Sequence, residues 1–145
     1  MFYGEYAHSI DRKGRIILPA KFRDTAKAHF IEKFFVTRGL DKCLFMLSEE
    51  EWRSQESKLK SISFTKQPSR TFNRLFFSGA VEVIFDAQGR MLIPQNLKDY
   101  AEIKRDVVII GVANRIEIWA KEKWEDFYKN SRQSYEEIAE KLIDG

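Results

Sequence analysis

Apolar and polar residues follow one another in an order that predicts two rounds of the same elements. Residues 5–10 and 80–85 have extended character, and the second of them, "AVEVIF", is rich in β-branched and aromatic residues that favour strands. A polar turn follows each stretch. A short apolar run, "RIIL" or "RMLI", then predicts a returning strand. Pro19 and Pro94 end these runs, because proline cannot donate a hydrogen bond to a strand ladder.

The pattern after each proline predicts a helix, then a β-hairpin, then a second helix. "PAKFRDTAKA" and "PQNLKDYAEI" place apolar residues at helical spacing. "FFVTR" turns through "GLDK" into "CLFML", and "VVIIG" turns through "VANR" into "IEIW". Ser48 and Glu51 form a capping box that predicts a helix from Glu49, whereas Ala120 is a poorer cap in the second round. The stretch "SYEEIAEKLI" predicts an amphipathic helix with Tyr135, Ile138, Ala139 and Leu142 on one side.

The two polar turns carry one motif. "DRKGRIILP" begins at Asp11 and "DAQGRMLIP" begins at Asp86, 75 residues later, with Asp, Gly, Arg and Pro at matching positions. Asp favours the first position of a type I turn and Gly the fourth, so each motif predicts a tight hairpin loop. "GLDKCLFMLSEEEW" at 39–52 also aligns with "GVANRIEIWAKEKW" at 111–124, in the same order. The chain is therefore a tandem duplication of a unit of about 50 residues.

One such unit buries too little surface to be stable alone, so we expect the two copies to share a core. We expect a first repeat with its following helix over 1–60, a linker and connecting helix over 61–78, and a second repeat with C-terminal helices over 79–145. The connecting helix itself is predicted at 69–77. The expected fold class is β-rich α+β. Residues expected in the core or anchoring helices to the sheet are Cys43, Met46, Trp52, Met91 and Trp124.

Composition narrows the class of protein. Of the 145 residues, 43% are hydrophobic and 32% are charged, and no apolar run approaches the roughly 18 residues that cross a membrane. The first residues lack the pattern of a secretion signal. A single cysteine permits no disulfide within the chain, which fits a reducing cytosol best.

Positive charge is unevenly spread along the chain, although the formal net charge is only +3. Residues 53–79 hold six Lys or Arg against one Glu. Gly4–Arg23 holds five basic and two acidic residues, whereas Gly79–Lys98 holds two of each. The first turn motif is therefore the more basic of the two, and an acidic partner is permitted but not required.

The paired Asp and Arg of each motif have two interpretations. In the structural one, Asp11 and Asp86 accept backbone N–H groups of their own turns, and Arg15 and Arg90 form exposed ion pairs worth less than about 1 kcal/mol. In the functional one, each Arg offers two parallel N–H groups to guanine or phosphate, and the Asp orients it. The residues that strengthen the positive field in the first copy are Arg12, Lys13, Lys21 and Arg23, whereas the second tip has Ala87 and Gln88. Arg70 and Arg74 on the connecting helix are expected to face water, with contact to nucleic acid as the alternative role.

An enzyme is poorly supported. His8 and His29 are the only histidines and both lie in the first repeat, where an ordinary polar role is the commoner one. The chain has no Gly-rich phosphate loop, nucleophile elbow or metal-ligand spacing. Asp11 and Asp86 could pair as a carboxylate dyad, but a nearby arginine would hold each ionised and prevent general-acid work. We therefore expect no catalytic residue, metal, cofactor or small-molecule substrate.

The sequence resembles a known family. "MFYGEYAHSIDRKGRIILPAKFRD" resembles the opening of MraZ proteins, and "TRGLDKCLF", "FFSGAVEV", "DAQGR" and "GVANRIEIW" match the rest of that pattern. The resemblance covers nearly the whole chain. It implies the AbrB-like swapped-hairpin class, in which two β-rich copies interlace into a barrel-like body. It also implies a bacterial transcriptional regulator, cytoplasmic and nucleoid-associated, that assembles into closed rings.

The resemblance further implies a partner and a site. The partner is double-stranded DNA, at short direct repeats in the promoter of the regulator's own division and cell-wall operon. The family's contacts are attributed to the Asp-x-x-x-Arg motifs, so the expected DNA-binding residues are Asp11, Arg12, Lys13, Gly14, Arg15, Asp86, Gly89 and Arg90. A single tip presents few charges, so repetition around a homo-oligomer would raise affinity through effective concentration. The alternative is a self-assembling scaffold without sequence-specific DNA binding.

Overall fold

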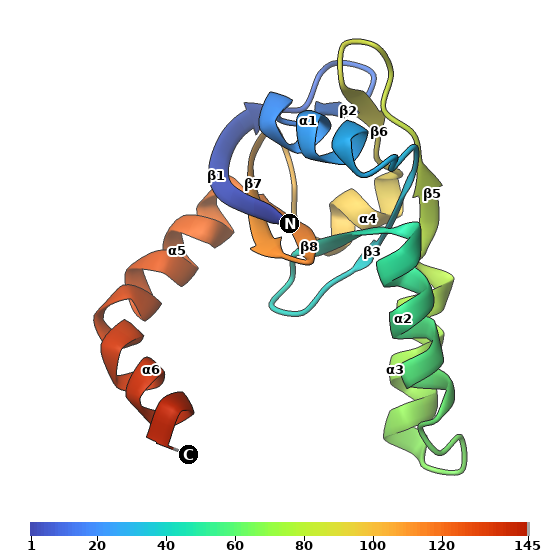
Figure 1. The fold of residues 1–145 in the computed structure, drawn as a ribbon, viewed down its shortest axis with the longest axis vertical. Coiled ribbons are helices and arrows are strands. Elements are labelled where there is room, and N and C mark those ends of the chain that lie inside the picture. Colours follow the sequence, from blue (N-terminus) through green and yellow to red (C-terminus); the bar gives the residue numbers. More distant parts are fainter. Residues whose placement is uncertain (145) are drawn as a thin grey trace.

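The computed structural model describes residues 1–144 as a mixed α+β fold, with one six-stranded antiparallel sheet and a separate two-stranded ribbon (Figure 1). Gly145, the last residue of the expected second repeat, lies outside the described residues. The strands are β1 (Phe2–Ser9), β2 (Arg15–Ile17), β3 (Phe34–Arg38), β4 (Leu44–Ser48), β5 (Val81–Val83), β6 (Arg90–Leu92), β7 (Asp106–Ala113) and β8 (Arg115–Ala120). The helices are α1 (Ala20–Ala28), α2 (Glu49–Lys60), α3 (Gln67–Ser78), α4 (Gln95–Tyr100), α5 (Lys121–Ser131), the 3-10 helix η1 (Arg132–Ser134) and α6 (Tyr135–Asp144).

The large sheet contains strands from both repeats. The large sheet has the order β1-β7-β8-β4-β3-β5, so an outer strand of each repeat lies beside a strand of the other repeat. Strand β1 pairs with β7 along its whole length, from Phe2 opposite Ala113 to Ser9 opposite Asp106. The short β5 pairs with β3, and β4 meets β8 at the centre. Because each repeat supplies an edge to the other, neither can form this sheet alone.

The strands flanking each Asp–Gly turn do not form the predicted hairpin. The Asp11 amide donates to the Arg15 carbonyl at 3.0 Å, which closes the turn, but beyond it β1 joins β7 while β2 joins β6. The cause is burial, because Ile16 in β2 lies opposite Met91 in β6 and both side chains are at most 1% exposed. A turn motif fixes the local reversal of the chain, whereas the apolar residues that follow it select the strand's partner.

The large sheet is open. Strands β1 and β5 form its two edges and are not paired with each other, so the sheet does not close into a barrel. The edges are unequal, with eight residues in β1 and three in β5.

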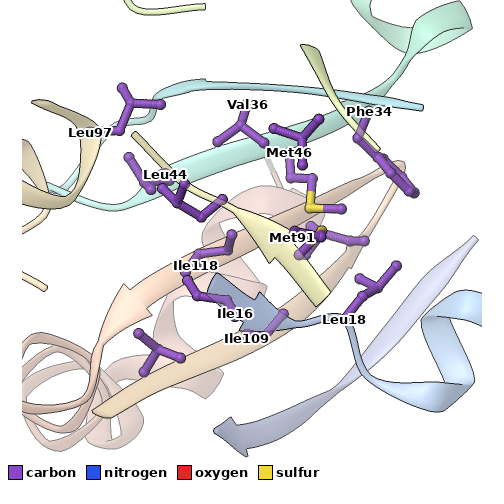
Figure 2. Close-up of a cluster of buried hydrophobic side chains, with 14 of the residues drawn as sticks. Ile16, Leu18, Phe34, Val36, Leu44, Met46, Met91, Leu97, Ile109 and Ile118 are labelled. Carbon is purple, nitrogen blue, oxygen red and sulfur yellow. The ribbon is translucent and has the colours of Figure 1, made fainter. Parts of the chain in front are cut away.

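The main core lies between the ribbon and one face of the sheet. Figure 2 shows Ile16 and Met91 of the ribbon pointing toward Met46 and Ile118 of the sheet. All four side chains are at most 1% exposed, which confirms the predicted core positions of Met46 and Met91. Helices α1 and α4 pack at the sides of the ribbon and contribute Phe22 and Leu97 to the same core. The ribbon therefore has one face in the core and one face outside.

Three helices cover the opposite face of the sheet. The ring of Trp52 in α2 is stacked between the rings of Phe35 in β3 and Phe76 in α3, and the distances between ring centroids are 5.1 and 5.5 Å. In α5, Trp124 packs edge-on against Trp119 of β8 at 5.4 Å. The expected anchoring roles of the two helix tryptophans are confirmed.

Most other local predictions are confirmed. The two predicted helices after proline are α1 and α4, the connecting helix is α3, and β3–β4 and β7–β8 are hairpins within their own repeats. Ser48 caps α2 by accepting a hydrogen bond from the Glu51 amide at 3.2 Å. Helix α5 begins after Ala120 with no side-chain cap, and Cys43 is fully buried.

We predict that Gly111→Ala destabilises the fold by separating β1 from β7. Gly111 lies opposite Gly4, and a Cβ at position 111 would overlap the backbone of Phe2 and Tyr3. Backbone atoms cannot rotate away as a side chain can, so the free energy of unfolding should fall by about 2 kcal/mol or more in urea titrations. Glu5→Ala, a change at an exposed position of the partner strand β1, should cost no more than about 0.5 kcal/mol. An unchanged urea midpoint for Gly111→Ala would contradict the register.

Candidate nucleic-acid interface

The first turn is organised by one carboxylate. Asp11 Oδ1 accepts hydrogen bonds from the backbone amides of Lys13 and Arg15, both at 2.9 Å. Its Oδ2 accepts from Arg15 Nε at 2.7 Å. The structural and functional interpretations of the motif are therefore compatible. The same Asp holds the turn and fixes the guanidinium, while the two terminal nitrogens of Arg15 lie beyond this contact.

The second turn repeats this arrangement. Asp86 Oδ1 accepts from the amides of Gln88 at 3.0 Å and Arg90 at 2.8 Å, and its Oδ2 accepts from Arg90 Nε at 2.7 Å. The Gln88 side chain adds a contact, because its Oε1 accepts from Arg90 Nη2 at 3.3 Å. The first turn has Lys13 at the equivalent position. The Arg90 guanidinium therefore has an additional hydrogen bond to the Gln88 amide, whereas Arg15 has the positively charged Lys13 in its turn instead.

Each turn needs its glycine. Gly14 has φ +79° and Gly89 has φ +82°, a left-handed conformation that side chains disfavour. Their amides donate to the carbonyls of Asp11 and Asp86 at 3.0 and 2.9 Å. The Gly14 carbonyl accepts from the Ile93 amide at 3.4 Å, and the Gly89 carbonyl accepts from the Leu18 amide at 2.7 Å, so both of these hydrogen bonds join one repeat to the other. The two turns are therefore held by each other's strands.

The ribbon places both arginines on its outer face. Arg15 lies opposite Leu92, and Ile17 lies opposite Arg90. Side chains alternate between the faces of a strand, so these four share one face while Ile16 and Met91 take the other. The exposed fractions are 40% for Ile17 and 61% for Leu92. The result is a surface with an Asp-bound guanidinium at each end and two apolar side chains between them, which we call the ribbon face.

A positively charged side chain from each repeat also lies against the turn of the other repeat. The Nζ of Lys98, from α4, lies 2.6 Å from where a Cβ on Gly14 would be. The side chain of Arg23, from α1, lies in the same way against Gly89, with Nε 2.8 Å from that position. Arg23 was expected to strengthen the first tip. It instead lies at the second, because the repeats interlace.

The crossed cations change which residue flanks each turn, but the first turn stays the more basic because one cation replaces another. The second tip, with Ala87 and Gln88, gains Arg23, and the more basic first tip gains Lys98. Arg12 and Lys13 remain exposed at the first tip. Positions 23 and 98 are equivalent under the 75-residue offset, which is the sequence signal that could have identified both. Using that signal requires knowing that the copies exchange partners.

The environment keeps both carboxyls ionised. The hydrogen bond from the Arg15 amide is the main cause that holds the pKa of Asp11 below its ordinary value, and the Arg15 side chain and Lys13 amide act in the same direction. The Arg90 amide, with the Arg90 side chain and Gln88 amide, lowers the pKa of Asp86 likewise. Burial and the charge of Arg23 lower the pKa of His8, which favours its neutral form. The ion pairs therefore persist at neutral pH.

Other kinds of site have little support among the described residues. Within residues 1–144, no three His, Cys, Asp or Glu side chains gather closely enough to hold a metal ion. None of the helices in that range is both long and apolar enough to cross a membrane. The fully buried Cys43 thiol has its pKa raised by burial, which disfavours the reactive thiolate.

Comparison with known families agrees with the duplication. A family model described as "MraZ protein, putative antitoxin-like" matches residues 1–75 and again residues 76–145. The two matches together span the chain, and each contains one Asp-x-x-x-Arg turn. This family is of the regulator type and is not a known enzyme family. The chain belongs to the MraZ family, as two tandem copies of its unit.

Proposed function

We propose that this protein is a sequence-specific DNA-binding transcriptional regulator. It acts on short direct repeats in the promoter of its own division and cell-wall operon, as a closed homo-oligomeric ring in the cytoplasm and on the nucleoid. The proposed contacts come from Asp11–Arg15 in the first turn and from Asp86, Gly89 and Arg90 in the second. The interlaced strands support assignment to the AbrB-like swapped-hairpin class, and the three segments 1–60, 61–78 and 79–145 remain our proposed division of the chain.

The observation that carries this proposal is the pair of equivalent Asp–Arg clusters at the two ends of the ribbon face. A two-stranded ribbon is narrow enough to enter the major groove of DNA. Arg15 and Arg90 each have Nε bound by a carboxylate, so each guanidinium is oriented before it meets a ligand. A guanidinium held in this way can offer its remaining N–H groups to guanine or to phosphate.

The residues around the arginines fit the same partner. Ile17 and Leu92 lie between the two clusters, and apolar side chains at such a position can contact thymine methyl groups. Lys98 and Arg23 flank the turns and add sequence-independent attraction to phosphate. Base-edge contacts and phosphate contacts are thus both available on one surface.

Affinity should depend on repetition. The net charge of the chain is only +3, and each phosphate neutralised adds only about −0.9 to the salt slope of binding. A ring that presents the ribbon face several times to spaced DNA repeats would bind far more tightly than one chain, because later contacts form at high effective concentration.

We predict that Arg15→Ala and Arg90→Ala each weaken binding to a fragment of the chain's own promoter by about tenfold or more. A lost two-bond arginine contact costs about 1–3 kcal/mol, and any lost phosphate contact lowers the salt slope. Fluorescence anisotropy at several salt concentrations measures both quantities. Arg132→Ala, which removes the same charge from the segment between α5 and α6, far from the ribbon in Figure 1, is the matched control and should bind normally.

The outcomes separate the candidate functions. Light scattering must show that each variant keeps the wild-type mass. A scaffold without sequence-specific binding would show no preference for the promoter over competitor DNA, in the wild type or any variant. Normal binding by both arginine variants would refute the assignment of the ribbon face.

A second prediction concerns the carboxylate. Asp11→Asn keeps an oxygen for the Lys13 and Arg15 amides, but its NH₂ group would face Arg15 Nε and release the guanidinium. Removing a negative charge should leave affinity for competitor DNA equal or higher, while a disordered arginine lowers the preference for the promoter. We expect the ratio of the two dissociation constants to fall several-fold by competition anisotropy. An unchanged ratio would mean that Asp11 acts on the turn alone.

A further inference from the structure

Helix α6 has an apolar side that the rest of the described chain leaves uncovered. The helix contains no buried residue. Tyr135 is 75% exposed, Ile138 49% and Leu142 79%, and these residues recur at the spacing of one helical face. A contiguous exposed apolar face of this kind marks an interaction site, and an amphipathic helix is suited to a groove.

The same chain contains a groove of matching character. A cavity of about 380 Å³ opens between α2, α3 and the β3–β4 turn. Leu40 and Leu75 at this groove are 63% and 52% exposed, so its apolar wall faces solvent. Its apolar lining includes Leu40, Leu47, Leu59, Phe72, Leu75 and Phe76. We call it the α2–α3 groove.

The helix and the groove carry opposite charges. Helix α6 has four acidic residues against one basic residue, Lys141. Residues 53–79, which run from α2 through α3, have six basic residues against one Glu. The charged residues that line the groove are two basic ones, Arg38 and Arg115, and one acidic one, Glu51. The side chain of Arg70 donates to the carbonyls of Phe64 and Thr65, at 3.1 and 3.0 Å, which holds its charge at the end of this helix pair.

Charge also disfavours the larger hollow of the molecule for this helix. That cavity, of about 870 Å³, has the exposed apolar residues Phe30 and Ile84 on its wall. Its lining also includes the consecutive acidic residues Glu49, Glu50 and Glu51. An acidic helix would meet like charge there, whereas the α2–α3 groove offers attraction.

The helix cannot fill its own groove. Figure 1 shows α5 and α6 on the opposite side of the body from α2 and α3. We infer that α6 of one chain docks in the α2–α3 groove of a second copy, so that copies join head to tail. A contact between two different surfaces of identical chains gives a ring if the rotation closes. This inference rests on the self-assembly proposed above and names the surfaces that produce it.

The test blocks each surface separately in the full-length chain. Ile138→Asp with Leu142→Asp disables the helix, and Leu75→Asp disables the groove. All three positions are at least 49% exposed, so the fold should tolerate the changes, with melting temperatures within about 3 °C of the wild type. Asn130→Asp, which adds a negative charge at an exposed position of α5 and leaves α6 intact, is the control. Light scattering after size exclusion measures the mass of each protein.

We expect the wild type and the control to have the mass of several chains, and each blocked variant to have the mass of a single chain. A mixture of the two blocked variants has one intact helix and one intact groove, and should therefore stop at a species of two chains. An oligomer that keeps its mass in both variants would overturn the docking inference while leaving self-assembly in place. Blocked variants whose mixture stays monomeric would overturn it too, and a monomeric wild type would overturn both proposals.

Discussion

The structure depends on the pairing of β2 with β6 across the two repeats. This three-residue ribbon buries Ile16 and Met91 against the sheet and forces their neighbours Arg15 and Arg90 to the outside. Because side chains alternate along a strand, the register that buries Ile16 and Met91 also places Arg15 and Arg90 on the outer face. A slip of one residue would bury the guanidinium groups and expose the apolar pair, so the hydrophobic core specifies the register of the ribbon face.

Interlacing explains why the chain carries two copies. Strand β1 of the first repeat completes the sheet of the second, and β5 of the second extends that of the first. Covalent linkage keeps the two copies together at any protein concentration, whereas a dimer of single units would depend on mass action. The crossed positions of Arg23 and Lys98 are a by-product of this exchange, and each turn receives the other repeat's cation in place of its own.

Local features were predictable from the sequence because they depend on neighbours in the chain. The turns at Asp11 and Asp86, the cap at Ser48 and the helices after Pro19 and Pro94 all follow from short-range rules. The partner of each strand was not predictable in this way. A hairpin at the Asp–Gly turn satisfies the same local rules, and only the burial of Ile16 against Met91 favours the exchanged pairing. The residues of the candidate site were predicted, but its shape and its flanking cations depend on contacts between residues of different repeats, such as Arg23 with Gly89 and Ile16 with Met91.

Linking the copies in one polypeptide has also removed their obligation to be identical. A symmetric homodimer presents two equal halves and therefore reads palindromes. Here one tip has Arg12 and Lys13 where the other has Ala87 and Gln88, so the two ends of the ribbon face are chemically distinct. Such a surface has a direction, so reversing a DNA duplex bound to it would change which bases meet which tip. If the proposed function holds, a surface with a direction would match DNA elements that are repeated in the same orientation.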